Sequence, residues 1–175
     1  LQMLKQGGNA VDAAIATQLA LAVVYPGAGN LGGGGFMVAH FKNGQNIALD
    51  YRETAPAKAH KDMYLDSNGN AVVAWSQLGH LASGTPGTVA GLFTAHKYAK
   101  LPFKKLIAPA IRLAENGFAV SESEAASLNE AKEDFLQLNT FQTAFTKDGD
   151  WKAGDILVQK DLANTLKRIG EFGQK

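Results

Sequence analysis

The chain has 175 residues, 46% hydrophobic and 19% charged, a composition that predicts one globular domain with a hydrophobic core and excludes intrinsic disorder. Its 17 basic and 16 acidic side chains are spread along the whole length for a net charge of +1, which excludes the basic stripe of a nucleic-acid-binding protein. The lack of cysteine excludes disulfides, thiolate metal sites and cysteine nucleophiles, and it leaves the cellular compartment open.

The first long element is predicted to be a buried helix over residues 10–24. Asn9 is its expected N-cap, with Asp12 placed as the partner in a capping box. The segment is apolar nearly all round, which is typical of a helix covered on several sides. It is too short to span a membrane, and Asp12 and Gln18 argue against a secretory signal. Residues 1–4 already predict a helix, so we expect a fragment whose ends are cut.

A β-hairpin is predicted after a glycine-rich loop, and glycine at this density indicates backbone conformations or close approaches that other residues cannot make. Residues 36–41 form the first expected strand, Asn43 and Gly44 the turn, and residues 47–52 the return strand. Alternation places the return-strand residues on two faces: Ile47, Leu49 and Tyr51 on one, and Ala48, Asp50 and Arg52 on the other. A lone two-stranded hairpin is not stable, so more sheet or a covering layer is expected.

Helices dominate the rest of the chain. Thr85 is expected to cap a helix that has Pro86 at its first position and ends near residue 100. The remaining helices are expected over residues 103–116, interrupted by Pro109 and closed by Gly117; from a capping box of Ser121 and Glu124 to about Leu138; and from about Asp161 to about Lys175. The fold class predicted from these elements is α+β, helix-rich with one clear β-hairpin.

Several apparent motifs favour ordinary structural roles. Residues 27–32 (GAGNLG) match the dinucleotide fingerprint, but a helix precedes and a strand follows the glycines, which reverses the required order. The polar turn at residues 66–70 misplaces the glycine of a calcium loop. The histidines have no metal-ligand spacing: His40, His60, His80 and His96. No metal site is therefore predicted.

Arg52 is the candidate binding residue, because it stands where the return strand gives way to a loop. Its planar guanidinium can bind a substrate carboxylate through two parallel hydrogen bonds. The alternative is an ordinary ion pair with Asp50 or Glu53, and residue spacing alone favours that alternative.

A set of motifs in order then resembles the gamma-glutamyltranspeptidase family. Residues 7–14 (GGNAVDAA) are similar to its opening helix, and residues 29–37 (GNLGGGGFM) to its glycine-rich loop. Residues 50–56, with DYRE at 50–53 and AP at 55–56, resemble the family segment that carries the substrate-binding arginine. The set is completed by residues 82–91 (ASGTPGTVAG). The likeness is strongest over residues 7–91 and continues more loosely to about Ile169.

This resemblance implies a fragment of the αββα sandwich of the N-terminal nucleophile hydrolases, with residues 1–175 as a single incomplete domain in the N-terminal part of the large subunit. It implies a precursor that cuts itself, freeing a threonine that attacks gamma-glutamyl amides such as glutathione and passes the glutamyl group to water or an amino acid. It assigns Arg52 to the substrate's α-carboxylate and needs no metal or organic cofactor. The implied partners are the rest of the large subunit and the small subunit; the implied location is periplasmic or secreted, with the signal peptide outside this chain.

The chain also departs from the family pattern. It begins with Leu1, and the family's Thr-Thr-His-x-Ser nucleophile segment is missing, so no catalytic residue is assigned in this chain and it is expected to be inactive alone. Two alternatives remain: a related acylase or poly-gamma-glutamate hydrolase, and a non-catalytic binding or assembly protein on the same scaffold. A Thr-Thr-His-x-Ser segment beyond Lys175 would favour an enzyme.

Overall fold

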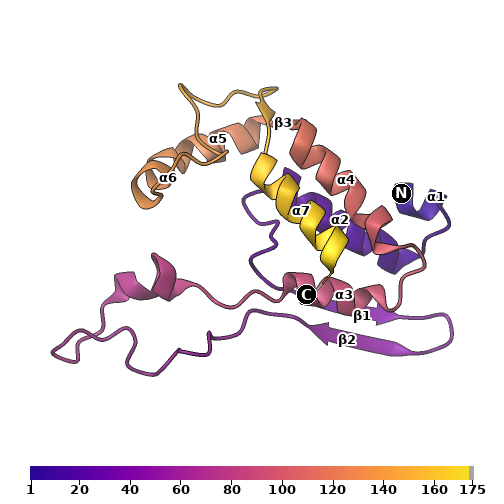
Figure 1. Ribbon diagram of the computed structural model, residues 1–175, viewed down its shortest axis with the longest axis horizontal. Helices are drawn as coiled ribbons and strands as arrows, with labels where there is room; N and C mark the ends of the chain where they lie inside the picture. Colours follow the sequence, from indigo (N-terminus) through magenta and orange to yellow (C-terminus); the bar gives the residue numbers. More distant parts are fainter. Residues whose placement is uncertain (174–175) are drawn as a thin grey trace. The chain divides into compact units, whose positions relative to one another are not determined.

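The computed structural model describes residues 1–173 (Figure 1). Contacts divide the chain into two compact units, one built from residues 1–31 with the chain from residue 92 on, and one from residues 32–91. Helices predominate, and the longer of the two strand pairs in residues 1–173 is an antiparallel hairpin. The predicted α+β class is therefore confirmed. The prediction of a single incomplete domain stays a prediction.

The first unit opens with α1 (Gln2–Lys5) and the buried helix α2 (Ala10–Val24), as predicted. The capping box is present: the Asn9 side chain accepts from the Asp12 backbone N–H at 3.1 Å, and the Asp12 carboxylate accepts from the Asn9 N–H at 2.7 Å. A local hydrogen-bond pattern therefore sets the start of this helix.

Asp12 also has a tertiary role that the sequence did not predict. Its side chain is completely buried and accepts hydrogen bonds from the backbone N–H groups of Lys100, at 3.0 Å, and Leu101, at 2.8 Å. Burial by itself raises the pKa of Asp12, but the N–H donors of Asn9, Leu101 and Lys100 and the charge of His96 together lower it below its ordinary value. The carboxylate thus ties the start of α2 to a distant loop.

The core of this unit lies where α2, α4 (Phe103–Asn116) and α7 (Lys160–Phe172) run side by side (Figure 1). Each helix contributes fully buried side chains to the core: Ile15, Leu19 and Val23 from α2, Leu106, Ile107 and Ala110 from α4, and Ala163 and Leu166 from α7. Such burial is the main stabilising term for the unit. Gln159 adds a polar link, since its side-chain amide donates to the Val23 carbonyl at 2.8 Å.

The helix predictions beyond residue 100 are largely confirmed, with corrections. α4 has its predicted bounds and closes at Gly117, whose φ is +83°, but it continues through Pro109 instead of being interrupted there, because the turns on both sides are anchored in the core. α7 ends at Phe172; the predicted end at Lys175 lies outside the described residues.

The single helix expected from Ser121 to Leu138 is wrong. The capping box is present, but the structure has two helices, α5 (Glu122–Glu130) and α6 (Lys132–Leu138), which meet at Ala131. A short strand pair, β3 (Phe118–Ala119) with β4 (Ile156–Leu157), was not predicted either. Residues next to both features share a hydrophobic cluster with Trp151: Val120, Ala125, Leu128 and Leu157.

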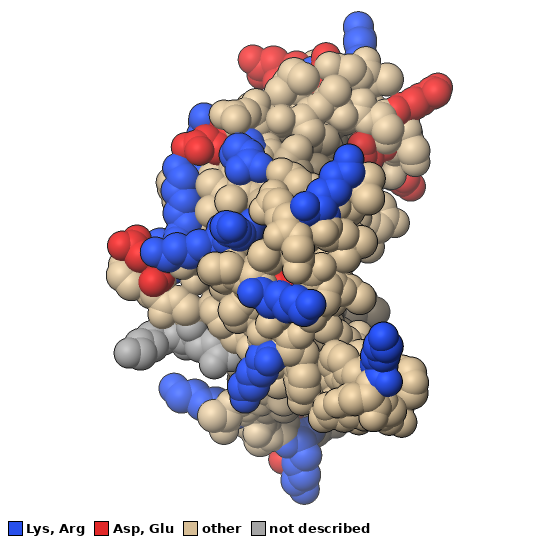
Figure 2. Space-filling view, turned by 90° about the vertical axis from the view of Figure 1, so that its right-hand side faces the viewer, with Lys and Arg blue, Asp and Glu red and all other residues tan. Residues whose placement is uncertain are grey.

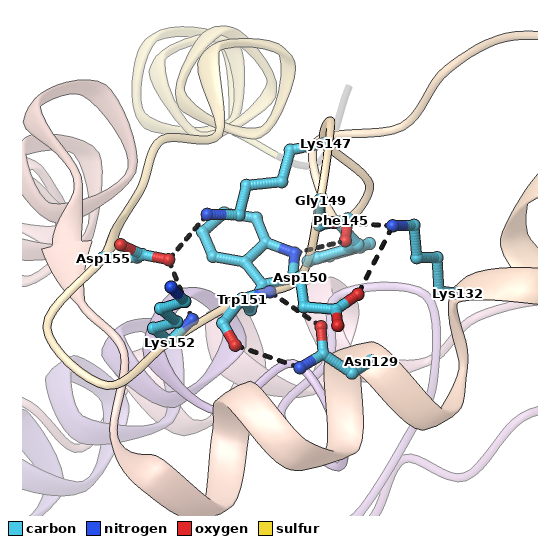
Figure 3. Close-up of polar contacts among 9 residues, drawn as sticks. All are labelled: Asn129, Lys132, Phe145, Lys147, Gly149, Asp150, Trp151, Lys152 and Asp155. Atoms are coloured by element: carbon cyan, nitrogen blue, oxygen red, sulfur yellow. Dashed lines mark hydrogen bonds and ion pairs between the residues drawn. The ribbon is translucent and has the colours of Figure 1, made fainter.

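The loop that contains Trp151 is held by a polar network around a buried indole (Figure 3). The Trp151 Nε1–H donates to the Phe145 carbonyl at 2.8 Å, and the Asn129 side chain exchanges two hydrogen bonds with the Trp151 backbone, at 2.7 and 3.0 Å. The Lys147 ammonium lies 4.8 Å from the Trp151 ring centre and pairs with Asp155 at 2.6 Å. These contacts bind the last turn of α5 to the loop that contains Trp151.

The second unit contains the predicted hairpin, β1 (Phe36–His40) with β2 (Asn46–Asp50), in which Phe36 is paired with Asp50. Alternate residues differ in burial as the period of two requires. The chain continues through the 3₁₀ helices η1 (Val73–Ser76) and η2 (His80–Ala82) to α3 (Thr88–His96).

The predicted start of this last helix at Thr85 and Pro86 is wrong, and so is its end near residue 100. Thr85 forms an antiparallel bridge with Thr54, and its N–H donates to the Thr54 carbonyl at 2.8 Å. α3 begins at Thr88 instead, and in its first turn the Gly91 N–H donates to the Gly87 carbonyl at 2.8 Å. It ends at His96, before the loop whose N–H groups Asp12 binds.

The charged side chains are spread over the face seen in Figure 2, as the balanced composition predicts. Most Lys and Arg side chains on that face are separated by uncharged surface. Within residues 1–173 there is no helix both long and apolar enough to cross a membrane. No group of three or more His, Cys, Asp or Glu residues in that part of the chain could hold a metal ion.

Candidate functional site

Arg52 follows the hairpin directly, two residues after the last residue of β2. Its backbone N–H donates to the Asp50 side-chain oxygen Oδ1 at 3.0 Å, a local hydrogen bond of the kind that turns a chain away from a strand. The arginine side chain is exposed. The strand end and this turn together set the position from which the side chain projects.

The guanidinium of Arg52 lies over the ring of Phe36, with its central carbon 6.0 Å from the ring centre. This is the outer range of a cation–π contact. The ion pairs within residues 1–173 join Lys132 to Asp150, Lys147 to Asp155 and Lys167 to Glu115, so none includes Arg52. The ion pair that spacing favoured, with Asp50 or Glu53, is therefore not formed in the described chain, and Asp50 instead accepts the Arg52 backbone N–H.

The backbone that carries Arg52 is enclosed by glycines. A Cβ placed on Gly34 would lie 2.6 Å from the Arg52 Cα, and one placed on Gly87 would lie 2.1 Å from the Tyr51 carbonyl oxygen. Gly35 continues the hairpin pairing, since the Tyr51 N–H donates to its carbonyl at 3.0 Å. The close approach predicted from the glycine-rich loop is confirmed at Gly34.

The arrangement suits binding of an anion. A guanidinium offers five N–H donors in a fixed plane, and here it stands exposed on a backbone held by strand pairing and close packing. A guanidinium can bind a carboxylate through two parallel hydrogen bonds, and these charge-assisted bonds are stronger than bonds from a neutral donor. Two of the histidines named from the sequence form hydrogen bonds within the chain: His40 with the Asn46 side chain at 2.7 Å, and His96 with the Leu101 carbonyl at 2.8 Å.

Comparison with known proteins now gives the class of the protein. The structure aligns with a crystal structure of Helicobacter pylori gamma-glutamyltranspeptidase with a TM-score of 0.93 and 52% identity, over 98% of this chain and 50% of that one. It aligns with the gamma-glutamyltranspeptidase from Pseudomonas nitroreducens complexed with L-DON with a TM-score of 0.88 and 44% identity, over 98% and 50%. The fold is thus that of a segment of an N-terminal nucleophile hydrolase.

Sequence comparison gives the family. Residues 1–175 match the family model described as Gamma-glutamyltranspeptidase. The glutathione hydrolase proenzyme of Escherichia coli (strain K12) is 50% identical over 99% of this chain, which covers 30% of that relative. The chain belongs to the gamma-glutamyltranspeptidase family, and it spans about 30% of the length of the curated relatives it matches.

The sequence singled out Arg52 as a candidate, but it did not indicate the residues that pack against the Arg52 backbone. Gly87 lies in the motif of residues 82–91, and its backbone lies against Tyr51 and Arg52. The only available signal was the number of glycines in the segments before and after the arginine. Glycine content indicates a close approach without saying what approaches.

Proposed function

We propose that the protein containing this chain is a gamma-glutamyl hydrolase and transferase, and that Arg52 binds the α-carboxylate of the glutamyl group. Membership of the family supports the reaction. The observation that carries the site is Arg52 itself, exposed on an enclosed backbone and outside every ion pair of residues 1–173. An arginine committed to a structural ion pair would have had its donors occupied.

The rest of the proposal concerns the whole protein. A threonine outside this chain attacks the gamma-glutamyl amide of a glutathione-like substrate, and the acyl-enzyme passes the group to water or an amino acid. The partners of this chain are the remainder of the large subunit and the small subunit that bears the threonine. The enzyme acts in the periplasm or outside the cell. Proenzyme names among the relatives support the processed, two-part organisation.

The test is cleavage of a gamma-glutamyl anilide by the full-length gene product, with and without an added amino acid as acceptor. Release of the aniline, faster when the acceptor is present, is the expected result. A glutaryl anilide, which lacks the α-amino group, is the matched comparison. Preference for the glutaryl compound would instead favour the acylase alternative, and a correctly processed protein that cleaves neither would favour a binding protein.

Residues 1–175 produced alone are expected to show no cleavage of the same anilide. This chain lacks a terminal threonine and contributes a binding residue rather than a nucleophile. The measurement is anilide turnover by the isolated chain beside the full-length product at equal molar concentration. Measurable turnover that survives repurification would show that this chain holds a nucleophile of its own.

Replacing Phe36 by leucine is expected to raise KM for the gamma-glutamyl anilide about two- to fivefold with kcat unchanged. The substitution keeps an apolar side chain but removes the ring beneath the guanidinium, and an exposed cation–π contact contributes about 0.5–1 kcal/mol. Val38→Ala is the control, because Val38 is 82% exposed two residues further along the same face of β1. Equal effects of the two substitutions would contradict a specific role for the ring.

A further inference from the structure

We propose that Gly87, together with Gly34, is a positioning residue that sets the direction of Arg52 by packing against the Tyr51–Arg52 peptide. The inference rests on the proposed role of Arg52 and extends it to residues that touch no substrate. All of these residues lie in the unit formed by residues 32–91.

The packing is closest at Gly87. A Cβ there would lie 2.1 Å from the Tyr51 carbonyl oxygen and 2.8 Å from the Arg52 carbonyl oxygen. A Cβ on Gly34 would lie 2.6 Å from both the Tyr51 carbonyl oxygen and the Arg52 Cα. Real side-chain carbons do not come this close to backbone atoms, so only glycine fits at either place unless the backbone moves.

Hydrogen bonds limit how far the Gly87 backbone could move away from the Tyr51–Arg52 peptide. Its N–H donates to the Gly33 carbonyl at 2.9 Å, and the Thr88 N–H donates to the same oxygen at 3.0 Å. On the other side, Thr54 and Thr85 exchange two backbone hydrogen bonds, at 3.1 and 2.8 Å. The segment after Arg52 and the segment that contains Gly87 are thus bound to each other just beyond the contact. A methyl group added at Gly87 therefore acts on the peptide at residues 51–52.

The tyrosine beside the arginine is held in the same way. A Cβ on Gly91 would lie 2.2 Å from Cγ of Tyr51, and one on Gly35 would lie 2.8 Å from Cε2 of the same ring. With the ring seated between these positions, the Tyr51 backbone has little freedom to rotate. Bidentate binding of a carboxylate by Arg52 depends on the orientation of the guanidinium as well as on its charge. A rotation of the Tyr51–Arg52 peptide would therefore weaken binding although the guanidinium is still present.

The test is a double-mutant cycle in the full-length gene product with Gly87→Ala, Arg52→Ala and the double variant. Gly87→Ala is expected to raise KM for the gamma-glutamyl anilide about 10-fold with kcat nearly unchanged, because the carboxylate is held alike in the ground and transition states. In the Arg52→Ala background the glycine substitution should have little further effect on KM. Gly27→Ala is the matched control, since a Cβ there meets no atom within 4 Å.

Gly84→Ala is the second variant, for use if Gly87→Ala fails to fold or to be processed, because it should displace the segment after Arg52 less. The nearest atom to a Cβ at Gly84 is Cβ of Glu53, at 3.1 Å, and a smaller rise in KM is expected there. Effects of the glycine and arginine substitutions that add in full would overturn the proposal, as would a folded Gly87→Ala variant with the parent KM.

The crystal structure of Gly87→Ala separates this inference from the proposed function. A displaced peptide at residues 51–52, in an enzyme that is indifferent to Arg52→Ala, would leave the packing role standing and remove the substrate role of the arginine. An undisplaced peptide would overturn the packing role whatever the kinetics of the arginine variant.

Discussion

Arg52→Ala in the full-length gene product is expected to raise KM for a gamma-glutamyl anilide about 10- to 150-fold and to leave kcat nearly unchanged. A hydrogen bond to a charged group contributes about 1.5–3 kcal/mol, which corresponds to that range. The α-carboxylate lies away from the amide that reacts, so the arginine binds it equally in the ground and transition states. Losing such uniform binding changes KM rather than kcat.

A second substrate tests the same claim at the level of atoms. The 4-aminobutanoyl anilide has the amine and the reacting amide but lacks the α-carboxylate, so its kcat/KM should be nearly the same in the parent and in Arg52→Ala. Arg52→Lys should recover part of the loss with the gamma-glutamyl anilide, because an ammonium supplies the charge without the planar fork. Arg112→Ala, at an exposed arginine of α4, is the control. An equal loss with both substrates would show that Arg52 does not bind the carboxylate.

Asp12→Asn is expected to lower the free energy of unfolding by about 2–4 kcal/mol, the largest stability effect predicted for this chain. The new amide keeps the size of the carboxylate but replaces one acceptor oxygen with a donor. It cannot accept from Asn9, Lys100 and Leu101 together, and a buried N–H would be left without a partner. Denaturant unfolding of the purified protein measures the loss.

Asp134→Asn is the matched control, because Asp134 also lies in the first turn of a helix but is exposed. A change of only a few tenths of a kcal/mol is expected there, about the size of a screened helix-dipole effect. If the two variants were equally stable, the tertiary hydrogen bonds of Asp12 would have no net stabilising effect.

The pH dependence of stability gives an independent check on Asp12. Its pKa in the folded protein is lowered from an ordinary value of 3.8, so between these two values the unfolded chain binds more protons than the folded one. The stabilising contribution is therefore fully present above about pH 3.8 and is lost as the pH falls through the folded pKa. Asp12→Asn should flatten the acid limb of the stability profile, whereas Asp134→Asn should leave its shape unchanged.

Features that depend on neighbouring residues were predictable from the sequence. The helix that starts after Asn9 and the hairpin turn at Asn43 and Gly44 lie where the pattern predicted, and Ser121 with Glu124 begins α5 as expected. Each depends on hydrogen bonds or backbone angles within a few positions. The family resemblance likewise rested on short motifs in order, and the comparisons confirm it.

Tertiary contacts decided the features that the sequence missed. Thr85 is a residue type that often caps helices, but its backbone pairs with Thr54, 31 positions away, and the helix starts at Thr88. The helix expected to run to Leu138 breaks at Ala131, next to the segment that Asn129 binds to Trp151. In both cases long-range contacts lie where the structure departs from the local preference.

The sequence by itself determined the family, the fold class, the first helix, the hairpin and the choice of Arg52 as the candidate residue. Only the tertiary structure decided that Arg52 forms no ion pair within residues 1–173, that Gly34 and Gly87 pack against its backbone, and that Asp12 binds a loop 88 positions away. The physical reason is that a glycine only permits a close backbone approach, and a carboxylate only permits hydrogen bonds from N–H donors. Which backbone approaches the glycine, and which N–H groups the carboxylate binds, is decided when distant segments pack together.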